Sequence, residues 1–149
     1  MVDSTLKFWD LVGWTFALST DALRNIATLP EGIWIAAAVA LLAGLSQAIA
    51  QAVVLFINQV KPLRFVLSLV VNGVLFAAGS FFLIASTWLI TLLPWSEDIP
   101  FRTLATILGV SYVPLIFSFF GALPYLGVPI LTLLSVWHLL AMVIGFSAV

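Results

Sequence analysis

The 149-residue chain contains no cysteine and few charged residues. Only 7% of its residues are aspartate, glutamate, lysine or arginine, whereas 64% are hydrophobic. The lack of cysteine excludes disulfides, thiolate metal sites and cysteine nucleophiles. A soluble domain usually has about 25% charged residues, so this chain has too few to cover a water-facing surface. Its formal net charge of −1 provides no basic surface for nucleic acid.

Motifs of common enzyme classes are missing as well. The sequence contains no G-x-S-x-G, no H-E-x-x-H and no Walker phosphate-binding loop. The carboxylates all fall in the N-terminal segment or in a loop, where solvated charges explain them more simply than acid–base pairs. They are Asp3, Asp10, Asp21, Glu31, Glu97 and Asp98. We therefore predict a protein that is not an enzyme and that has no cofactor or metal site.

Four hydrophobic segments are long enough to cross a bilayer, which takes about 20 residues. They cover residues 33–60, 65–93, 101–120 and 130–149. The sequence thus predicts an all-α membrane protein of one domain, in which residues 33–149 form a bundle of about four transmembrane helices. The alternative, an apolar soluble subunit buried in a large assembly, fits poorly because the apolar runs are too long.

Residues 1–32 mix polar and apolar side chains at helical spacing. One helix is expected over Ser4–Ala17, and a second, short one follows Ser19 or Thr20, either of which can cap it. The apolar side of the second helix comprises Ala22, Leu23, Ile26 and Leu29. We predict that this segment lies in the membrane interface as amphipathic helices. It is either a flap anchored on the bundle or a docking helix for a partner.

Two stripes of side chains mark the expected inner faces of the spans. Small residues recur every four positions in the first span and let two helices approach closely. This candidate packing face is Ala40, Gly44, Ala48 and Ala52. A candidate buried polar cluster near the midplane comprises Gln47, Gln51, Asn72 and His138. Polar groups facing lipid cost several kcal/mol, so these side chains are either interhelical hydrogen-bond partners or a small-ligand site.

Pro114 lies inside the third span, where it removes a backbone donor. We predict a kink there, with Ser111 or a neighbouring helix meeting the freed carbonyl. His138 is the titratable side chain deepest in a span. It is either a neutral, hydrogen-bonded histidine or a pH-responsive group.

Two stretches carry a resemblance to a known family. They are LSQAIAQAVVLFINQVKPLRF, residues 45–65, and SYVPLIFSFFGALPYLGVPILTLLSVWHLLAMVIGF, residues 111–146. The spaced Pro, Gly and aromatic residues of the second stretch resemble the later half of the YIP domain, a family of small multi-spanning membrane proteins named for interacting with Ypt/Rab GTPases. The resemblance extends from about Asp21 onward and looks closest to bacterial members. It implies a role in membrane organisation and partner binding, and it transfers no catalytic residue.

The leading functional hypothesis is a non-enzymatic scaffold or accessory subunit. Its partners are the lipid bilayer and other integral membrane proteins or a second copy of itself. The alternative is a small oligomeric transporter or channel that uses the midplane polar cluster. Asp3, Lys7 and Asp10 interrupt any signal-like apolar core, so with the bacterial resemblance we expect a bacterial inner membrane. The lysines and arginines do not decide the orientation.

Overall fold

The structure is a computed structural model that describes residues 10, 13, 17, 19–93 and 99–148. These residues form helices and short connections without any strand, which confirms the all-α prediction. The helices are α2 (Thr20–Thr28), α3 (Gly32–Ile57), α4 (Pro62–Thr91), α5 (Phe101–Val110), the 3₁₀ helix η1 (Val113–Ala122) and α6 (Gly127–Ser147). Most of the helix expected over Ser4–Ala17 lies outside the described residues.

Four segments are long and apolar enough to cross a membrane, as predicted. They are α3, α4, the combined segment Phe101–Ala122 and α6. The chain is therefore an integral membrane protein with a helical bundle. Most boundaries differ from the predicted ones by one to three residues, and two of these differences have a local reason. The first span stops at Ile57 because Gln59 has a positive φ of 50°, and the fourth begins at Gly127 because a proline such as Pro129 is tolerated in the first turn of a helix.

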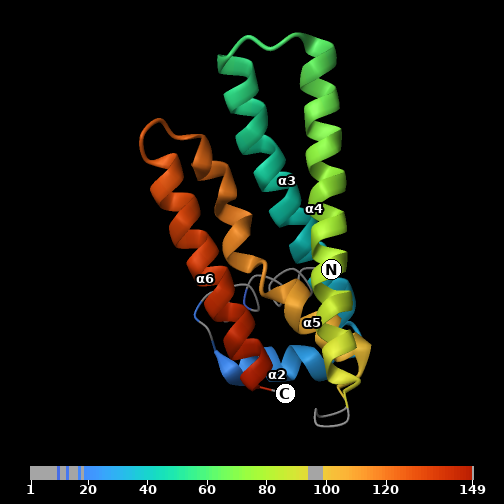
Figure 1. The fold of residues 1–149 in the computed structure, drawn as a ribbon. Helices are drawn as coiled ribbons and strands as arrows, with labels where there is room; N and C mark the ends of the chain where they lie inside the picture. The colour runs from blue at the N-terminus through green and yellow to red at the C-terminus, as the bar shows by residue number, and fades with distance from the viewer. Residues whose placement is uncertain (1–9, 11–12, 14–16, 18, 94–98, 149) are drawn as a thin grey trace, which may run out of the picture.

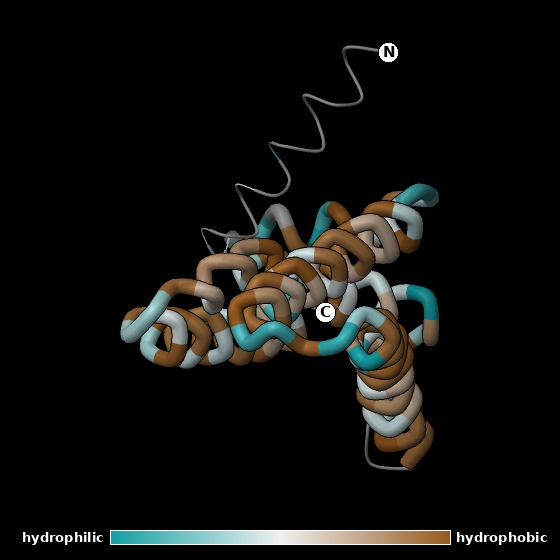
Figure 2. Tube along the Cα trace, turned by 90° about the horizontal axis from the view of Figure 1, so that it is seen from above, coloured by the Kyte–Doolittle hydropathy of each residue, from teal (hydrophilic) through white to brown (hydrophobic). Residues whose placement is uncertain are grey.

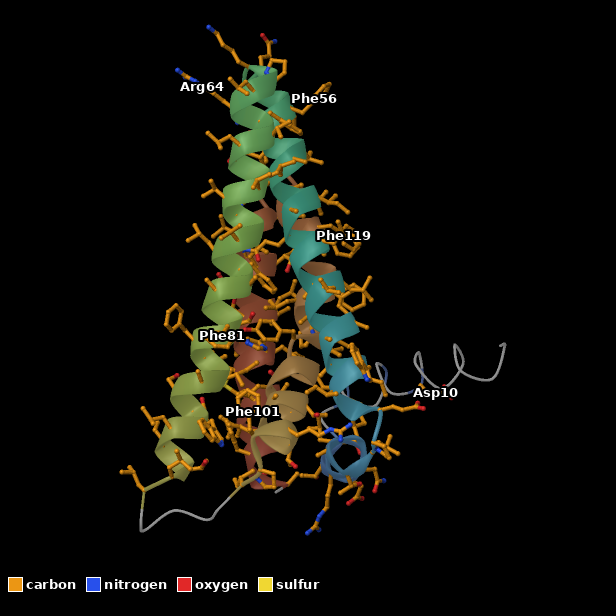
Figure 3. All side chains as sticks on the ribbon, turned by 90° about the vertical axis from the view of Figure 1, so that its right-hand side faces the viewer. Asp10, Phe56, Arg64, Phe81, Phe101 and Phe119 are labelled. Atoms are coloured by element: carbon orange, nitrogen blue, oxygen red, sulfur yellow. The ribbon has the colours of Figure 1, made fainter. Side chains whose placement is uncertain are left out.

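The spans form two antiparallel hairpins above a short crossing helix (Figure 1). One hairpin is α3 with α4, and the other is η1 with α6. The loop between α3 and α4 projects beyond the loop between η1 and α6 (Figure 1). Seen from above and from the side, α4 leans away from the other spans towards the loop that leads to α5 (Figures 2 and 3). Polar colours in Figure 2 gather at the connections, and the spans themselves are mostly hydrophobic.

The third span is the centre of the bundle. Of the most apolar 18 residues of this span, 67% are buried. The same share is 17% for α3, 17% for α6 and 0% for α4. Every residue from Leu104 to Pro114 is buried. The backbones of α3 and α5 come close at Ala36, because a Cβ added to Gly109 would lie 2.6 Å from the Ala36 Cβ. The other spans leave most of their surface exposed, so this central span supplies most of the packing within the chain.

The short helix α2 places its apolar side on the bundle. Leu23 and Ile26 are each only 1% exposed and belong to the core cluster that includes Ala36, Val39 and Val113. The Arg102 guanidinium at the start of α5 donates a hydrogen bond to the Pro30 carbonyl after α2. The helix α2 thus packs against α3, α5 and α6.

The close approach at Gly109 gives the first prediction. We expect Gly109→Ala to lower the free energy of unfolding by about 1–3 kcal/mol, because the added methyl overlaps Ala36 and the two helix backbones must separate. The matched control is Gly73→Ala on α4, where an added Cβ meets no atom within 4 Å. Unfolding in mixed micelles with increasing SDS, followed by circular dichroism, measures both. Equal stability of the two variants would contradict the packing described here.

Candidate functional site: a bridged helix break and a polar cavity

The third span changes from α-helix to 3₁₀ helix around Pro114. The α-helix α5 ends at Val110, and η1 starts at Val113 with Pro114 in its first turn. In the 3₁₀ pattern the amide of residue 114 would bond to the Ser111 carbonyl, but proline has no N–H. A carbonyl left without a donor inside hydrocarbon is costly. The predicted kink is thus a change of helix type that frees one particular carbonyl.

His138 on α6 meets that carbonyl. Its Nδ1 lies 2.7 Å from the Ser111 carbonyl oxygen. A carbonyl only accepts, so Nδ1 must carry the proton and donate it. The Ser111 hydroxyl turns the other way and donates to the Leu108 carbonyl at 2.7 Å. The neighbouring helix, rather than the serine hydroxyl, therefore closes the break.

A series of contacts between aromatic rings extends from His138 through the bundle. The Tyr112 ring centre lies 4.5 Å from the His138 ring at an interplanar angle of 34°. The Tyr112 ring also meets the Phe76 ring of α4 edge-on, with ring centres 5.5 Å apart. Phe76 in turn lies against Gly44 of α3, where an added Cβ would come within 3.1 Å of the ring. One contact chain thus joins all four spans.

A second polar feature is a cavity between the two hairpins. Its volume is about 330 Å³, and residues of all four spans line it. The lining residues are Gln47, Ala50, Gln51, Val54, Leu55, Ser68, Ser118, Gly121 and Leu131. Gln47 and Gln51 form no hydrogen bond with another described residue, and their polar atoms remain accessible. None of the lining side chains is charged, so the cavity suits a ligand group that is neutral and forms hydrogen bonds.

The predicted polar residues are distributed between these two features. Gln47 and Gln51 share the cavity, whereas His138 is bonded to Ser111 in the break. Asn72 is half-buried on α4, one turn after Ser68, and does not line the cavity. All four residues of the predicted packing face, Ala40, Gly44, Ala48 and Ala52, are half-buried, and Phe76 covers Gly44.

Sequence reasoning missed two buried serines, Ser46 on α3 and Ser118 in the third span. Ser46 is 6% exposed, and its hydroxyl accepts a 2.9 Å hydrogen bond from the Phe119 backbone N–H. Ser118, 3% exposed, donates to the Leu115 carbonyl at 2.6 Å. The available signal was the position of Ser46 on the face Ala36, Val39, Ala43, Ser46 and Ala50, all of which are buried. This face packs on the third span, beside the predicted small-residue stripe.

Few ionisable side chains of the described residues lie within the spans. Among the described residues no group of three or more His, Cys, Asp or Glu side chains is placed to hold a metal ion. The described lysines, arginines and carboxylates lie outside the spans or within a first helical turn. The one imidazole in the spans uses its Nδ1 to close the helix break. The polar side chains of the cavity that form no hydrogen bond with another described residue are Gln47, Gln51 and Ser68.

The bridge between His138 and Ser111 can be tested by a double-mutant cycle. We expect His138→Phe, which keeps a ring against Tyr112, to lower the free energy of unfolding by about 0.6–1.7 kcal/mol, as for other hydrogen bonds between membrane helices. In a Pro114→Ala background the cost should fall towards zero, because residue 114 then has an N–H for the Ser111 carbonyl. SDS unfolding of the four proteins measures both costs. Equal costs in the two backgrounds would refute the proposed closure.

Comparisons with known proteins identify no relative. No protein-family model matches the chain, and neither the curated proteins nor the solved structures include a significant match. The resemblance to the YIP domain therefore stays a prediction.

Proposed function

We propose that this chain is a non-enzymatic integral membrane protein that acts as a scaffold or accessory subunit. In this proposal, the outer side of α4 binds a helix of another membrane protein. The observation that carries the proposal is the lack of packing around α4 within the chain. Within the chain α4 contacts its neighbours along one side, through residues such as Phe76, which leaves its outer side available for docking.

The burial of α4 differs from that of its neighbours. Although α4 is the longest helix, with 30 residues, none of its most apolar 18 residues is buried. Its principal contacts are with α3 and α5. Without a hydrophobic driving force in lipid, helices associate where their surfaces allow close packing. A helix held on one side only therefore keeps its other surface for lipid or for a partner.

The composition of that surface favours a partner helix. Gly73, Ala77 and Ser80 recur at i, i+4 and i+7 and so lie on one face of α4. Gly73 and Ala77 are exposed, and a Cβ added to Gly73 meets no atom of the chain within 4 Å. Small residues at this spacing permit close backbone approach between membrane helices. The candidate face around Gly44 is less suitable, because Phe76 already covers it.

The cellular setting belongs to the same proposal. We place the protein in a bacterial inner membrane, on the basis of the charged N-terminal residues and the resemblance of residues 45–65 and 111–146 to bacterial YIP-domain proteins. An accessory role in membrane organisation agrees with that resemblance. The Rab connection of the family is not part of the proposal.

Crosslinking in native membranes tests the partner surface. We expect wild-type protein to crosslink to a stoichiometric membrane partner or to a second copy, and Gly73→Phe to lose most of that product because the ring blocks close approach. Val71→Phe is the matched control: residues two apart on a helix point to nearly opposite sides, and Val71 is also exposed, at 47%. Mass spectrometry after affinity purification identifies the product.

Two results would contradict this proposal. One is a wild-type protein that yields no crosslinked product in native membranes. The other is equal loss of the product in Gly73→Phe and Val71→Phe, which would mean that the small-residue face is not the contact.

A second candidate function, a small oligomeric transporter or channel, is favoured by the polar cavity alone. The cavity has lining residues from all four spans, and two of them are glutamines. The packing of the third span argues against a solute pathway through a single chain, because every residue of Leu104–Pro114 is buried. We expect proteoliposomes to show no solute flux above protein-free vesicles. Flux that Gln47→Leu abolishes would favour transport instead.

A further inference from the structure

The cavity lies near one membrane boundary. Ser68 is six residues from the start of α4, Gln51 six residues from the end of α3 and Leu131 four residues from the start of α6. At 1.5 Å per residue these positions are about 6–9 Å from the helix ends, and Gln47 is about 15 Å deep. The hydrocarbon core of a bilayer is about 30 Å thick. The cavity thus extends from the ester region of one leaflet towards the midplane.

The two glutamine amides require hydrogen-bond partners at that depth. Each side chain has an NH₂ donor pair and a carbonyl acceptor, and neither forms a hydrogen bond with another described residue. An amide left without partners in an apolar medium costs several kcal/mol. The hydroxyl of Ser68 faces the same cavity. The site therefore presents both donors and acceptors, and its NH₂ and hydroxyl groups can donate to carbonyl oxygens of whatever occupies it.

The charge at this end of the bundle has one sign. Lys61 and Arg64 are the described charged residues there, and both are exposed. Figure 3 places Arg64 at the tip of the α3–α4 hairpin. The described carboxylates, Asp10, Asp21 and Glu31, lie at or near the opposite end. A cationic rim without carboxylates favours an anionic group at this surface.

Arg64 and the cavity are aligned along α4. Arg64 precedes Ser68 by four residues, so both lie on about the same face, with Arg64 about 6 Å nearer the membrane surface. Beside the polar residues, Val54 and Leu131 line the cavity and are also 44% and 36% exposed. Along α3 and α4, the Arg64 cation thus lies nearer the membrane surface than Ser68 and the two glutamines.

We propose that the cavity binds one anionic diacyl phospholipid. Its phosphate lies against Arg64 and Lys61, and its ester carbonyls accept hydrogen bonds from Gln47, Gln51 and Ser68. Its acyl chains leave the cavity beside the exposed side chain of Leu131. The volume of about 330 Å³ accommodates the glycerol-ester region and not the whole lipid. This site uses the inner side of α4, so it is independent of the partner-binding face around Gly73.

Lipid retention tests the proposal directly. The protein is reconstituted in vesicles of equal parts phosphatidylglycerol and phosphatidylcholine, extracted into a delipidating detergent and weighed by native mass spectrometry. We expect wild type to retain phosphatidylglycerol, and Gln47→Leu/Gln51→Leu to retain about tenfold less, equivalent to about 1.4 kcal/mol of binding free energy. Arg64→Gln should reduce the preference for phosphatidylglycerol over phosphatidylcholine. Inorganic phosphate should not displace the lipid, because it lacks ester carbonyls and acyl chains.

Two matched variants serve as controls. Asn72→Leu removes a half-buried amide of α4 that does not line the cavity, and Arg24→Gln removes an exposed cation at the opposite end. Both should retain phosphatidylglycerol as wild type does. Equal retention in the double glutamine variant, equal retention of both lipids by wild type, or no retained lipid would each overturn the proposal. None of these results affects the crosslinking test of the Gly73 face.

Discussion

The hydrogen bond from His138 to the Ser111 carbonyl determines how the two hairpins meet. Inside a bilayer no water is available to a backbone carbonyl, so a span with a proline needs a donor from elsewhere. Here the donor is a side chain of the next span, 27 residues along the chain. The ring that donates it also contacts Tyr112, and through Phe76 this contact reaches α4 and α3. The N–H that Pro114 lacks thereby helps to fix the mutual positions of four helices. In lipid these helices have little hydrophobic driving force to associate.

The number and approximate extent of the spans follow from the sequence because hydrophobic length is a local property. The helix break at Pro114 can also be predicted from the sequence, because proline lacks the backbone N–H in any fold. What replaces that N–H is not local. Any of several polar side chains satisfies the chemistry, and the choice of His138 depends on how α6 is rotated against the third span. That rotation depends on close approaches such as Gly145 to Ile107, where an added Cβ would lie 2.5 Å from the isoleucine methyl.

The same reasoning explains the division of the polar cluster. Gln47 and Gln51 are one turn apart, so their common face follows from helical periodicity alone. Asn72 and His138 belong to other helices, and their places depend on crossing angles that periodicity does not encode. The small-residue stripe behaves similarly. Gly44 does allow a close neighbour, but the most buried face of α3 is the adjacent one, through Val39, Ala43 and Ser46.

The pitch of η1 has a consequence for the cavity. A 3₁₀ helix rises about 2.0 Å and turns about 120° per residue, whereas an α-helix rises about 1.5 Å and turns about 100°. Over the ten residues of η1 the two conformations differ by about 5 Å in length and about 200° in rotation. Ser118 and Gly121, three residues apart, coincide on one side only in the 3₁₀ form, and that side borders the cavity. An α-helical version of the same segment would end about half a turn away, so the shape of this binding space is set by the winding of one span.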